Sequence, residues 1–256
     1  MTGTVYLVGA GPGATDLLTL RAARLLERAD IVFYDALVHP DTLALARHAE
    51  KVAVGKRCGR HSTAQRFINK RLVDAARSHA CVIRLKGGDP MLFGRAQEEI
   101  AALEAAGIAY AVVPGVTAAL ACSAELGIAL TQRGVSRSVA MVTPRVAEGE
   151  AASTWADVLL NADSGAIYMG AGEAGMIAST LIERGKPAHT PVAVVENASL
   201  PDSRTVFTTL AGLPAMRSTI TGPALIFLGP AFVAKPARAN VDAIFSDDIR
   251  QSKAGT

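Results

Sequence analysis

The sequence predicts an α/β protein with a parallel sheet in its N-terminal half and a mixed sheet in its C-terminal half. Short apolar segments alternate with segments of helical periodicity up to residue 113, which is the pattern of a parallel sheet covered by helices. In the second half, segments 191–195 and 204–208 follow each other with no helix between them, so that sheet is expected to be mixed. The chain has 256 residues, of which 50% are hydrophobic, and this is enough for two domains.

Apolar runs bounded by turn residues predict five strands in the first half. These runs are Val5–Val8, Ile31–Tyr34, Lys51–Val54, Cys81–Leu85 and Tyr110–Val113. The intervening helices are expected at Leu17–Leu26, after the N-cap Asp41, at Ala64–Arg77 with Ser62 or Thr63 as the cap, and at Gln97–Ala106. Because parallel strands end at one edge of a sheet, the loops that follow these strands are expected to lie together.

Pro114-Gly115 is the expected hinge between two domains, 1–113 and 114–236. The second domain is expected to begin with an Ala-rich helix at Thr117–Leu126, and a further helix is expected at Met176–Glu183. Its expected strands are Ser138–Val142, Gly165–Met169, Pro191–Val195, Arg204–Thr208 and Ala224–Leu228, with a polar loop at 145–153. Residues 237–256 are polar and charged, and we expect a disordered tail.

Composition narrows the class of protein. The net charge of +3 comes without a clustered basic face, so nucleic acid is not an expected partner. The 3 cysteines and 5 histidines show no spacing typical of a disulfide framework or a metal site, and no metal is expected. No apolar run reaches the ~20 residues of a membrane span, and the N-terminus does not read as a signal peptide. We therefore expect a cytoplasmic protein.

Glycine-rich stretches follow two of the expected strands. Gly9–Ala14 matches G-x-G-x-x-G/A, with Asp30 or Asp35 where a ribose-binding acid is expected, and this predicts an NAD-dependent dehydrogenase. Pro12 weakens that interpretation because it removes an amide donor from the turn. The second stretch, Gly87-Gly88-Asp89, has no role in a dinucleotide site. Residues of this kind are also common in turns that bind no ligand, so either stretch could be such a turn.

Charged residues are also expected near the C-terminal ends of the parallel strands. Asp35 and Lys56 each follow a strand, where a carboxylate and an amine can bind a polar substrate or move protons. Arg95 and Glu98 are three positions apart and share a helix face, while Arg133 lies in a loop. Several arginines in one cleft would suit a polyanionic small molecule. Taken singly, each of these residues is more often a solvated surface charge.

Several segments, taken in order, resemble the tetrapyrrole methylases. The resemblance covers about residues 4–230 and places the chain nearest the branch that methylates uroporphyrinogen III, for which R-L-K-G-G-D-P-x-x-F-G-R and V-G-K-R are typical. The segments that carry it are Val5–Gly13, Tyr34-Asp35, Val54–Lys56, Arg84–Arg95, Val113–Ala118, Tyr168–Gly170 and Pro191–Glu196.

The resemblance implies an enzyme with a tetrapyrrole-methylase-like fold that binds S-adenosyl-L-methionine in a cleft between two domains, usually as a homodimer. It implies methylation of uroporphyrinogen III at C2 and C7, which gives precorrin-2 for sirohaem, cobalamin or haem d1, with S-adenosyl-L-homocysteine as the second product. It assigns a proton acceptor and donor to Asp35 and Lys56, and substrate-binding or catalytic groups to Arg95, Glu98 and Arg133. The implied cofactor residues are Pro12, Gly87, Gly88, Asp89, Leu92, Thr117, Ala118, Met169, Ala198 and Ala224.

A proton must leave the macrocycle after methylation, and the side chains differ in their fitness to take it. An arginine is a poor base because its pKa exceeds ~12. We therefore assign Arg95 to orientation and charge stabilisation, and either Asp35 or Glu98 to proton removal, as a hypothesis.

The sequence departs from the usual family motifs on the substrate side. Ala36, Gln132, Gly134 and Arg145 stand where that family usually has other residues. A precorrin methylase of the same fold therefore remains an alternative, as does a relative that binds cofactor or tetrapyrrole with weakened catalysis. The dehydrogenase based on Gly9–Ala14 is the alternative from a different class.

Overall fold

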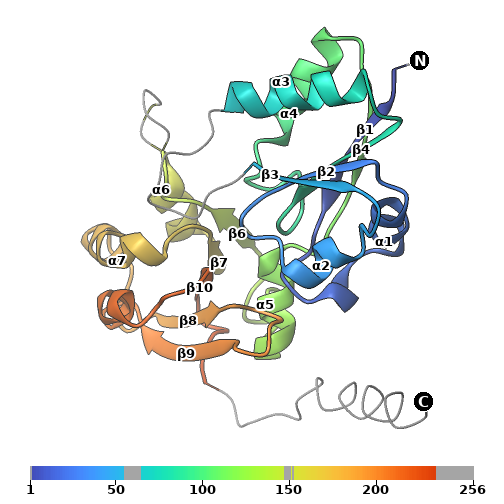
Figure 1. Ribbon diagram of the computed structural model, residues 1–256. Helices are drawn as coiled ribbons and strands as arrows, with labels where there is room; N and C mark the ends of the chain where they lie inside the picture. The colour runs from blue at the N-terminus through green and yellow to red at the C-terminus, as the bar shows by residue number, and fades with distance from the viewer. Residues whose placement is uncertain (1, 55–64, 147–150, 152, 235–256) are drawn as a thin grey trace, which may run out of the picture.

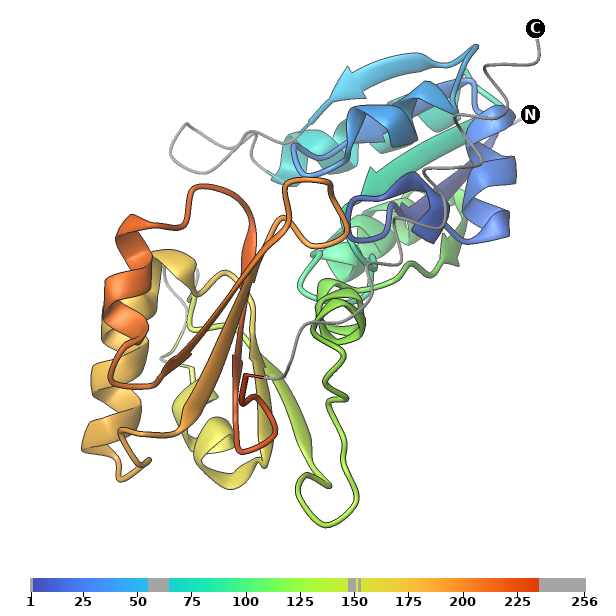
Figure 2. The same ribbon diagram turned by 90° about the horizontal axis from the view of Figure 1, so that it is seen from below.

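The structure is a computed structural model that describes residues 2–54, 65–146, 151 and 153–234. It contains two sheets, each flanked by its own helices, and the two assemblies lie side by side (Figures 1 and 2). We call residues 4–113 the N-terminal module and residues 118–228 the C-terminal module. The expected domain boundary at residues 113 and 114 falls between them and stays a prediction.

The N-terminal module is built on a five-stranded sheet whose strands are all parallel, as predicted. Its strands are β1 (Thr4–Gly9), β2 (Ile31–Tyr34), β3 (Glu50–Ala53), β4 (Cys81–Lys86) and β5 (Ala109–Val113), and they lie in the order β3-β2-β4-β1-β5. The connecting helices are α1 (Leu20–Glu27), α2 (Pro40–Ala44), α3 (Gln65–Ala76) and α4 (Ala96–Ala105).

Each face of this sheet buries a separate core. Apolar side chains of α3 and α4, including Leu72 and Leu103, pack on Val5 and Leu7 of β1. On the other face, Leu26 of α1 packs with the remaining apolar residues of the strands. Because β-strand side chains alternate between faces, consecutive residues of one strand fill both cores. The sheet is therefore covered on both sides, and only its edges and strand ends reach the surface.

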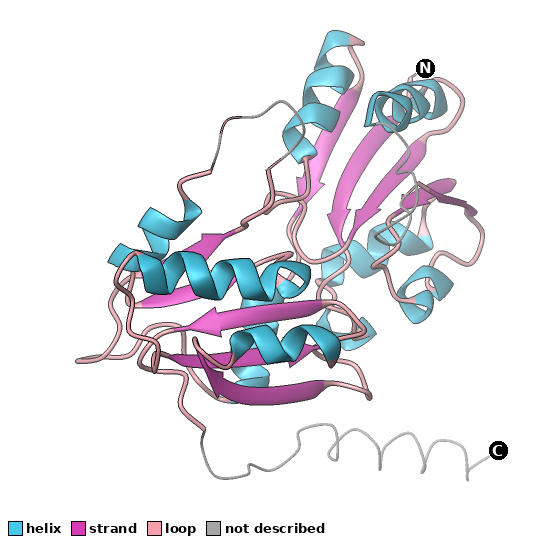
Figure 3. Ribbon diagram, turned by 90° about the vertical axis from the view of Figure 1, so that its left-hand side faces the viewer, coloured by secondary structure: helices cyan, strands magenta, loops and turns pink. Residues whose placement is uncertain are grey.

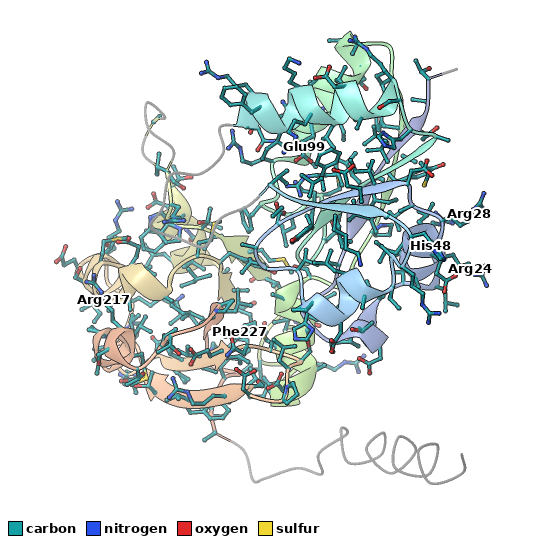
Figure 4. All side chains as sticks on the ribbon, viewed as in Figure 1. Arg24, Arg28, His48, Glu99, Arg217 and Phe227 are labelled. Atoms are coloured by element: carbon teal, nitrogen blue, oxygen red, sulfur yellow. The ribbon has the colours of Figure 1, made fainter. Side chains whose placement is uncertain are left out.

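The C-terminal module has a mixed five-stranded sheet, also as predicted. Its strands are β6 (Val139–Val142), β7 (Ser164–Ile167), β8 (Pro191–Glu196), β9 (Arg204–Thr209) and β10 (Ala224–Leu228), in the order β6-β7-β10-β8-β9. Only β6 and β7 pair in parallel. Helices α6 (Trp155–Asn161) and α7 (Ala174–Glu183) pack on one face, and α5 (Ala118–Leu126) packs on the other around Phe227 (Figures 3 and 4).

Some expected elements differ from the structure. The first helix begins at Leu20 and not at Leu17, because Thr15–Leu17 forms a 3-10 turn and the Thr19 hydroxyl caps the helix by accepting from the Ala22 amide at 3.2 Å. The N-cap of α2 is His39 and not Asp41, since Pro40 occupies the first helical position. Helix α6 and the 3-10 helix η3 (Leu213–Ser218) were not expected, because each is short and shows weak periodicity.

Several expectations concern residues outside the described part of the chain. These are the helix caps Ser62 and Thr63, the site residue Lys56, and the tail at 237–256. Among the residues that the structure describes, no helix is both long enough and apolar enough to cross a membrane.

Candidate functional site

The candidate site lies where the parallel sheet changes its direction of winding. From β1 the chain crosses to β2 with α1 on one face, and from β4 it crosses to β5 with α4 on the opposite face. β1 and β4 are neighbours in the sheet. Because α1 and α4 lie on opposite faces, the chain leaves the C-terminal ends of these two strands towards opposite faces. Open α/β sheets bind ligands at this position. Both glycine-rich stretches, 9–14 and 87–89, begin here.

Three glycines allow the loops after β1, β4 and β5 to meet. A methyl group added to Gly9 would come within 2.6 Å of the Gly115 Cα and 2.7 Å of the Gly88 carbonyl oxygen. One added to Gly115 would overlap the same carbonyl oxygen. Gly88 also has a φ of +67°, which residues with a side chain rarely adopt. Backbone thus packs directly on backbone, and a side chain at Gly9 or Gly115 would push the loops apart.

The geometry of Gly9–Ala14 argues against the dinucleotide interpretation. The Gly11 amide donates to Gly88 O at 3.2 Å and the Gly88 amide donates to Gly11 O at 2.7 Å, so these amides are not directed at a pyrophosphate. The α-helix that should receive the phosphates begins only at Leu20. A Rossmann site needs the glycine loop to open the helix, because the helix N-terminus binds the anion.

Asp89 joins two of the loops. One carboxylate oxygen accepts from the Met91 amide at 2.8 Å, and the other accepts from the Gly115 amide at 2.9 Å. The two bonds fix the turn after β4 and tie it to the start of the β5–α5 loop. The contribution of Asp89 to the predicted cofactor site is therefore to hold backbone in place.

An aromatic pair connects this edge to the C-terminal module. The rings of Phe93 and Tyr168 lie 5.0 Å apart, and the Tyr168 hydroxyl bonds to the Thr117 hydroxyl at 2.6 Å and accepts from the Ala119 amide at 3.1 Å. Burial raises the pKa of Tyr168, so the phenol stays neutral at physiological pH. Next to it, Met169 has a positive φ of 56° and an exposed side chain.

The loop between β8 and β9 makes the second connection between modules. The Ala14 amide donates to the Ser199 hydroxyl at 3.0 Å, and the Ser199 amide donates to Glu125 of α5 at 3.0 Å. This chain of bonds holds the loop containing Pro12 beside the loop containing Ala198 (Figure 2). Of the other predicted cofactor residues, Ala118 begins α5, Ala224 begins β10, and Leu92 lies between Asp89 and Phe93.

An ionic cluster that sequence reasoning did not assign lies below the same edge. Arg84 and Lys86 of β4 and Glu99 of α4 are at most 3% exposed. Arg84 contacts Glu99 through Nε at 2.8 Å and Asp35 through Nη2 at 2.5 Å. Lys86 Nζ contacts both Glu99 oxygens, at 3.1 and 3.0 Å. The signal was present in the sequence, because two basic residues inside an otherwise apolar strand require buried partners.

The cluster shifts the pKa values of its two cations in opposite directions. Burial, and then the charge of Arg84, lower the pKa of Lys86, although Glu99 and Asp35 oppose the shift. Burial also acts to lower the pKa of Arg84, but Asp35 and Glu99 outweigh it and raise that pKa above its usual value. Asp35 is the one member that reaches the surface, with 29% of its side chain exposed.

Arg95 and Glu98 form an exposed pair at the start of α4. Arg95 donates through Nε and Nη2 to the two oxygens of Glu98, at 2.6 and 2.7 Å. The hydrogen bond from Arg95 lowers the pKa of Glu98, which makes this carboxylate a weaker base. Arg95 also has a positive φ of 56°, which turns the chain sharply into the helix.

The structure does not bring Arg133 to the other predicted residues of the same chain. It lies in the exposed loop between α5 and β6, which is closed by a bridge between Gln132 and Ser136 and extends away from the N-terminal module (Figure 2). Lys56 lies outside the described residues. Within the described ranges, no group of histidine, cysteine or acidic side chains could hold a metal ion.

Comparison with known proteins gives consistent matches over most of the chain. The profile of the Tetrapyrrole (Corrin/Porphyrin) Methylases matches residues 4–214. The uroporphyrin-III C-methyl transferase of Thermus thermophilus, solved with S-adenyl homocysteine, is 41% identical, with a TM-score of 0.79 over 90% of this chain and 98% of that one. A cobalt precorrin-4 methyltransferase is 29% identical, with a TM-score of 0.78 over 90% of this chain and 96% of that one.

Curated relatives are longer than this chain. A siroheme synthase of Azotobacter vinelandii (strain DJ) is 46% identical over 230 residues, which make up 89% of this chain and 50% of that protein. A siroheme synthase of Pseudomonas fluorescens (strain Pf0-1) is 46% identical over 231 residues, again 89% of this chain and 50% of the relative. The chain thus spans about half the length of the curated relatives that it matches.

Proposed function

The chain belongs to the tetrapyrrole (corrin/porphyrin) methylase family, and from this premise we propose that it transfers methyl groups from S-adenosyl-L-methionine to C2 and C7 of uroporphyrinogen III. The product would be precorrin-2, in the direction of sirohaem. The observation that carries this proposal is the 41% identity to a uroporphyrin-III C-methyl transferase over 98% of that chain. We also propose that the enzyme works in the cytoplasm.

The residues at the sheet edge fit the methyl donor. There is open space beside Gly88, because a methyl group added to this glycine would lie 3.9 Å from its nearest neighbour, Thr117. Phe93 and Met169, on the loops after β4 and β7, expose apolar side chains, at 40% and 44%. These residues would hold the donor, together with the backbone of 87–89 and the loops of Pro12 and Ala198. When bound, S-adenosyl-L-methionine supplies a methyl group activated by its sulfonium.

Asp35 is the residue that we assign to proton removal. Its carboxylate is part-buried, and within the described part of the chain its only side-chain hydrogen bond is the one from Arg84. Glu98 is the weaker candidate because Arg95 engages both of its oxygens. Arg95, in turn, is a cation at the rim of the site and suits a substrate with many carboxylates.

Substitution separates these two carboxylates. Asp35→Asn is expected to lower kcat by about 10²–10⁴-fold, the usual range for a lost general base, while Glu98→Gln should have a smaller effect. Turnover would be followed by methyl transfer from labelled donor, with binding of S-adenosylhomocysteine as the check that each variant is folded. Near-normal turnover by Asp35→Asn would move the assignment to Glu98 or to another residue.

We further propose that the enzyme is a homodimer. Leu120 of α5 and Val135 of the α5–β6 loop are 54% and 40% exposed, and a second chain packed on this part of the molecule would cover their apolar side chains. The same loop carries Arg133, so a second chain packed on it would give this arginine a place near a site. Sedimentation velocity would decide, since a monomer at micromolar concentration contradicts the proposal.

A precorrin methylase is the second candidate, because a cobalt precorrin-4 methyltransferase has nearly the same TM-score. Calorimetry tests the cofactor, which is common to both candidates. Binding of S-adenosylhomocysteine without binding of NAD is the expected result. Binding of NAD alone would overturn both proposals in favour of a dehydrogenase. Incubation with each tetrapyrrole and labelled donor then distinguishes the two substrates.

A further inference from the structure

The ionic cluster below the sheet edge is expensive to bury. Arg84, Lys86 and Glu99 lie on the face of the N-terminal sheet that is otherwise filled by apolar side chains of α3 and α4. Figure 4 shows Glu99 between the helices α3 and α4 and the sheet. Burying an ion costs several kcal/mol, and well-packed apolar residues of similar size are often as stable or more stable. Stability alone therefore does not account for the cluster, and its contacts indicate another role.

The contacts of Arg84 lead from the core to the site. Each nitrogen of its guanidinium has a different partner: Nε donates to Glu99, Nη1 to the carbonyl of Leu85 at 3.1 Å, and Nη2 to Asp35. A planar guanidinium held at three points cannot rotate. It thus fixes one oxygen of the Asp35 carboxylate relative to β4, the strand that also leads into Gly87-Gly88.

Glu99 holds the inner end of this arrangement. Its carboxylate accepts from Arg84 and Lys86, and Oε1 also accepts from Gln65 of α3 at 3.2 Å. The charges of Arg84, Lys86, Glu99 and Asp35 sum to zero. Without Glu99, two buried cations would face Asp35 alone, and a buried charge that lacks a partner is costly. Glu99 therefore both anchors the guanidinium and balances its charge.

We propose that Arg84 is a positioning residue for the reaction, anchored by Glu99 and acting through the carboxylate of Asp35. This inference rests on the proposed function, because it assigns a partner to the proposed base. Arg84 and Glu99 do not touch substrate; they determine where the Asp35 oxygen that is not bonded to Arg84 points. A misplacement of about 1 Å at a reacting group can cost on the order of 10²-fold in rate.

A double-mutant cycle in kcat tests the inference. Arg84→Lys keeps the charge but cannot contact Glu99 and Asp35 together, and it is expected to lower kcat by about 10²-fold while the KM for S-adenosyl-L-methionine stays within about twofold. In an Asp35→Asn background the same change should have almost no further effect, because the group through which it acts is already lost. Arg184→Lys is the matched control, since Arg184 pairs with Asp157 at 2.7 Å in the C-terminal module, and its kcat should not change.

The outcomes separate the possible failures. Additive losses in the cycle, or full activity of Arg84→Lys, overturn the positioning role, as does an equal loss of kcat and of S-adenosylhomocysteine binding, which would indicate general damage. If Arg84→Lys does not fold, Glu99→Gln carries the same cycle, because it removes the negative charge and one acceptor oxygen of the anchor and leaves Arg84 in place. A folded wild-type chain that binds S-adenosylhomocysteine but methylates no uroporphyrinogen III overturns the proposed function, and this inference with it.

Discussion

Among the residues that the structure describes, charged side chains are buried at two places, and each place includes the last residue of a strand. In the N-terminal module these are Arg84 and Lys86 with Glu99. In the C-terminal module Glu196 ends β8, where it accepts from the amides of Thr221 and Gly222 and from Arg204. A buried charge persists only when such partners replace its lost hydration.

Glu196 makes the stability of the C-terminal module depend on pH. Burial acts to raise the pKa of this carboxyl, but the hydrogen bonds from Gly222, Thr221 and Arg204 outweigh it and lower the pKa to about 2 from a usual 4.5. Since the pKa is lower in the folded state, its stabilisation is complete above the usual value and disappears as the pH falls towards 2.

Glu196→Gln is therefore expected to cost about 1–3 kcal/mol of unfolding free energy at neutral pH, with a smaller difference from wild type at each step from about pH 5 down to 2. Urea unfolding at several pH values measures it. Glu183→Gln, at the exposed end of α7, is the control. A difference that is constant with pH would show that the ionised carboxylate is not what stabilises the fold.

At this scale the sequence indicated candidate residues but not the contacts that they make. Asp35, Gly88 and Thr117 could be named because they follow strands or match a motif. The partnership of Arg84 with Asp35 could not be named, since the residues are 49 positions apart and meet only because β2 and β4 are neighbours. The hydrogen bond between Asp89 and Gly115 could not be named either, because the residues are 26 positions apart and follow strands that are not neighbours in the sheet.

At the scale of elements, the meeting of three loops depends on the absence of side chains. Gly115→Ala is expected to cost about 1–3 kcal/mol of stability, because its methyl group would overlap the Gly88 carbonyl oxygen. It should also weaken S-adenosylhomocysteine binding by at least about tenfold, or about 1.4 kcal/mol.

The control for that substitution is Gly175→Ala in α7, where an added methyl group meets nothing within 4 Å. It should keep or slightly raise stability, because alanine favours the helix. Calorimetric titration and urea unfolding on both variants give the comparison. Unchanged binding by Gly115→Ala would show that the loops can separate without consequence, contrary to the proposed cofactor site.

Helices and strands with a strong apolar periodicity, or with turn residues at their ends, could be predicted from the sequence, and short elements could not. The five strands of the N-terminal module follow from apolar runs that end in turn residues. Helix α6 has only seven residues, and its sequence does not separate it from a loop. The late start of α1 follows from the cap at Thr19, a local signal that competes with the apolar repeat beginning at Leu17.

At the scale of the whole molecule, a chain of hydrogen bonds joins the modules in addition to the contact between Phe93 and Tyr168. It runs from Glu125 of α5 to Ser199 and from Ser199 to the Ala14 amide, and Glu125 also accepts from the Ser203 hydroxyl. Sequence could not predict it, because the residues come from three separate segments. The order of strands in the parallel sheet was likewise not predictable from apolar runs, which specify the strands but not their neighbours.

Glu125→Ala is expected to loosen this connection. Amide hydrogen exchange at Ala14 and Ser199 should become faster, while β1 and β8 keep their protection, since local openings need not unfold the modules. Helix α5 itself should not weaken, because Glu125 lies near its C-terminus, where a negative charge is unfavourable. Unchanged exchange at both amides would contradict the connection, and Glu183→Ala is the matched control.

Methylation of uroporphyrinogen III by this chain, which we propose, is tested most directly by the mass of the product. The purified chain would be incubated anaerobically with uroporphyrinogen III and isotopically labelled S-adenosyl-L-methionine, and the tetrapyrrole would be analysed by mass spectrometry. We expect a product that carries two labelled methyl groups, formed through a singly methylated species, and almost none with Asp35→Asn. A tetrapyrrole of unchanged mass, from a folded chain that binds S-adenosylhomocysteine, would contradict it.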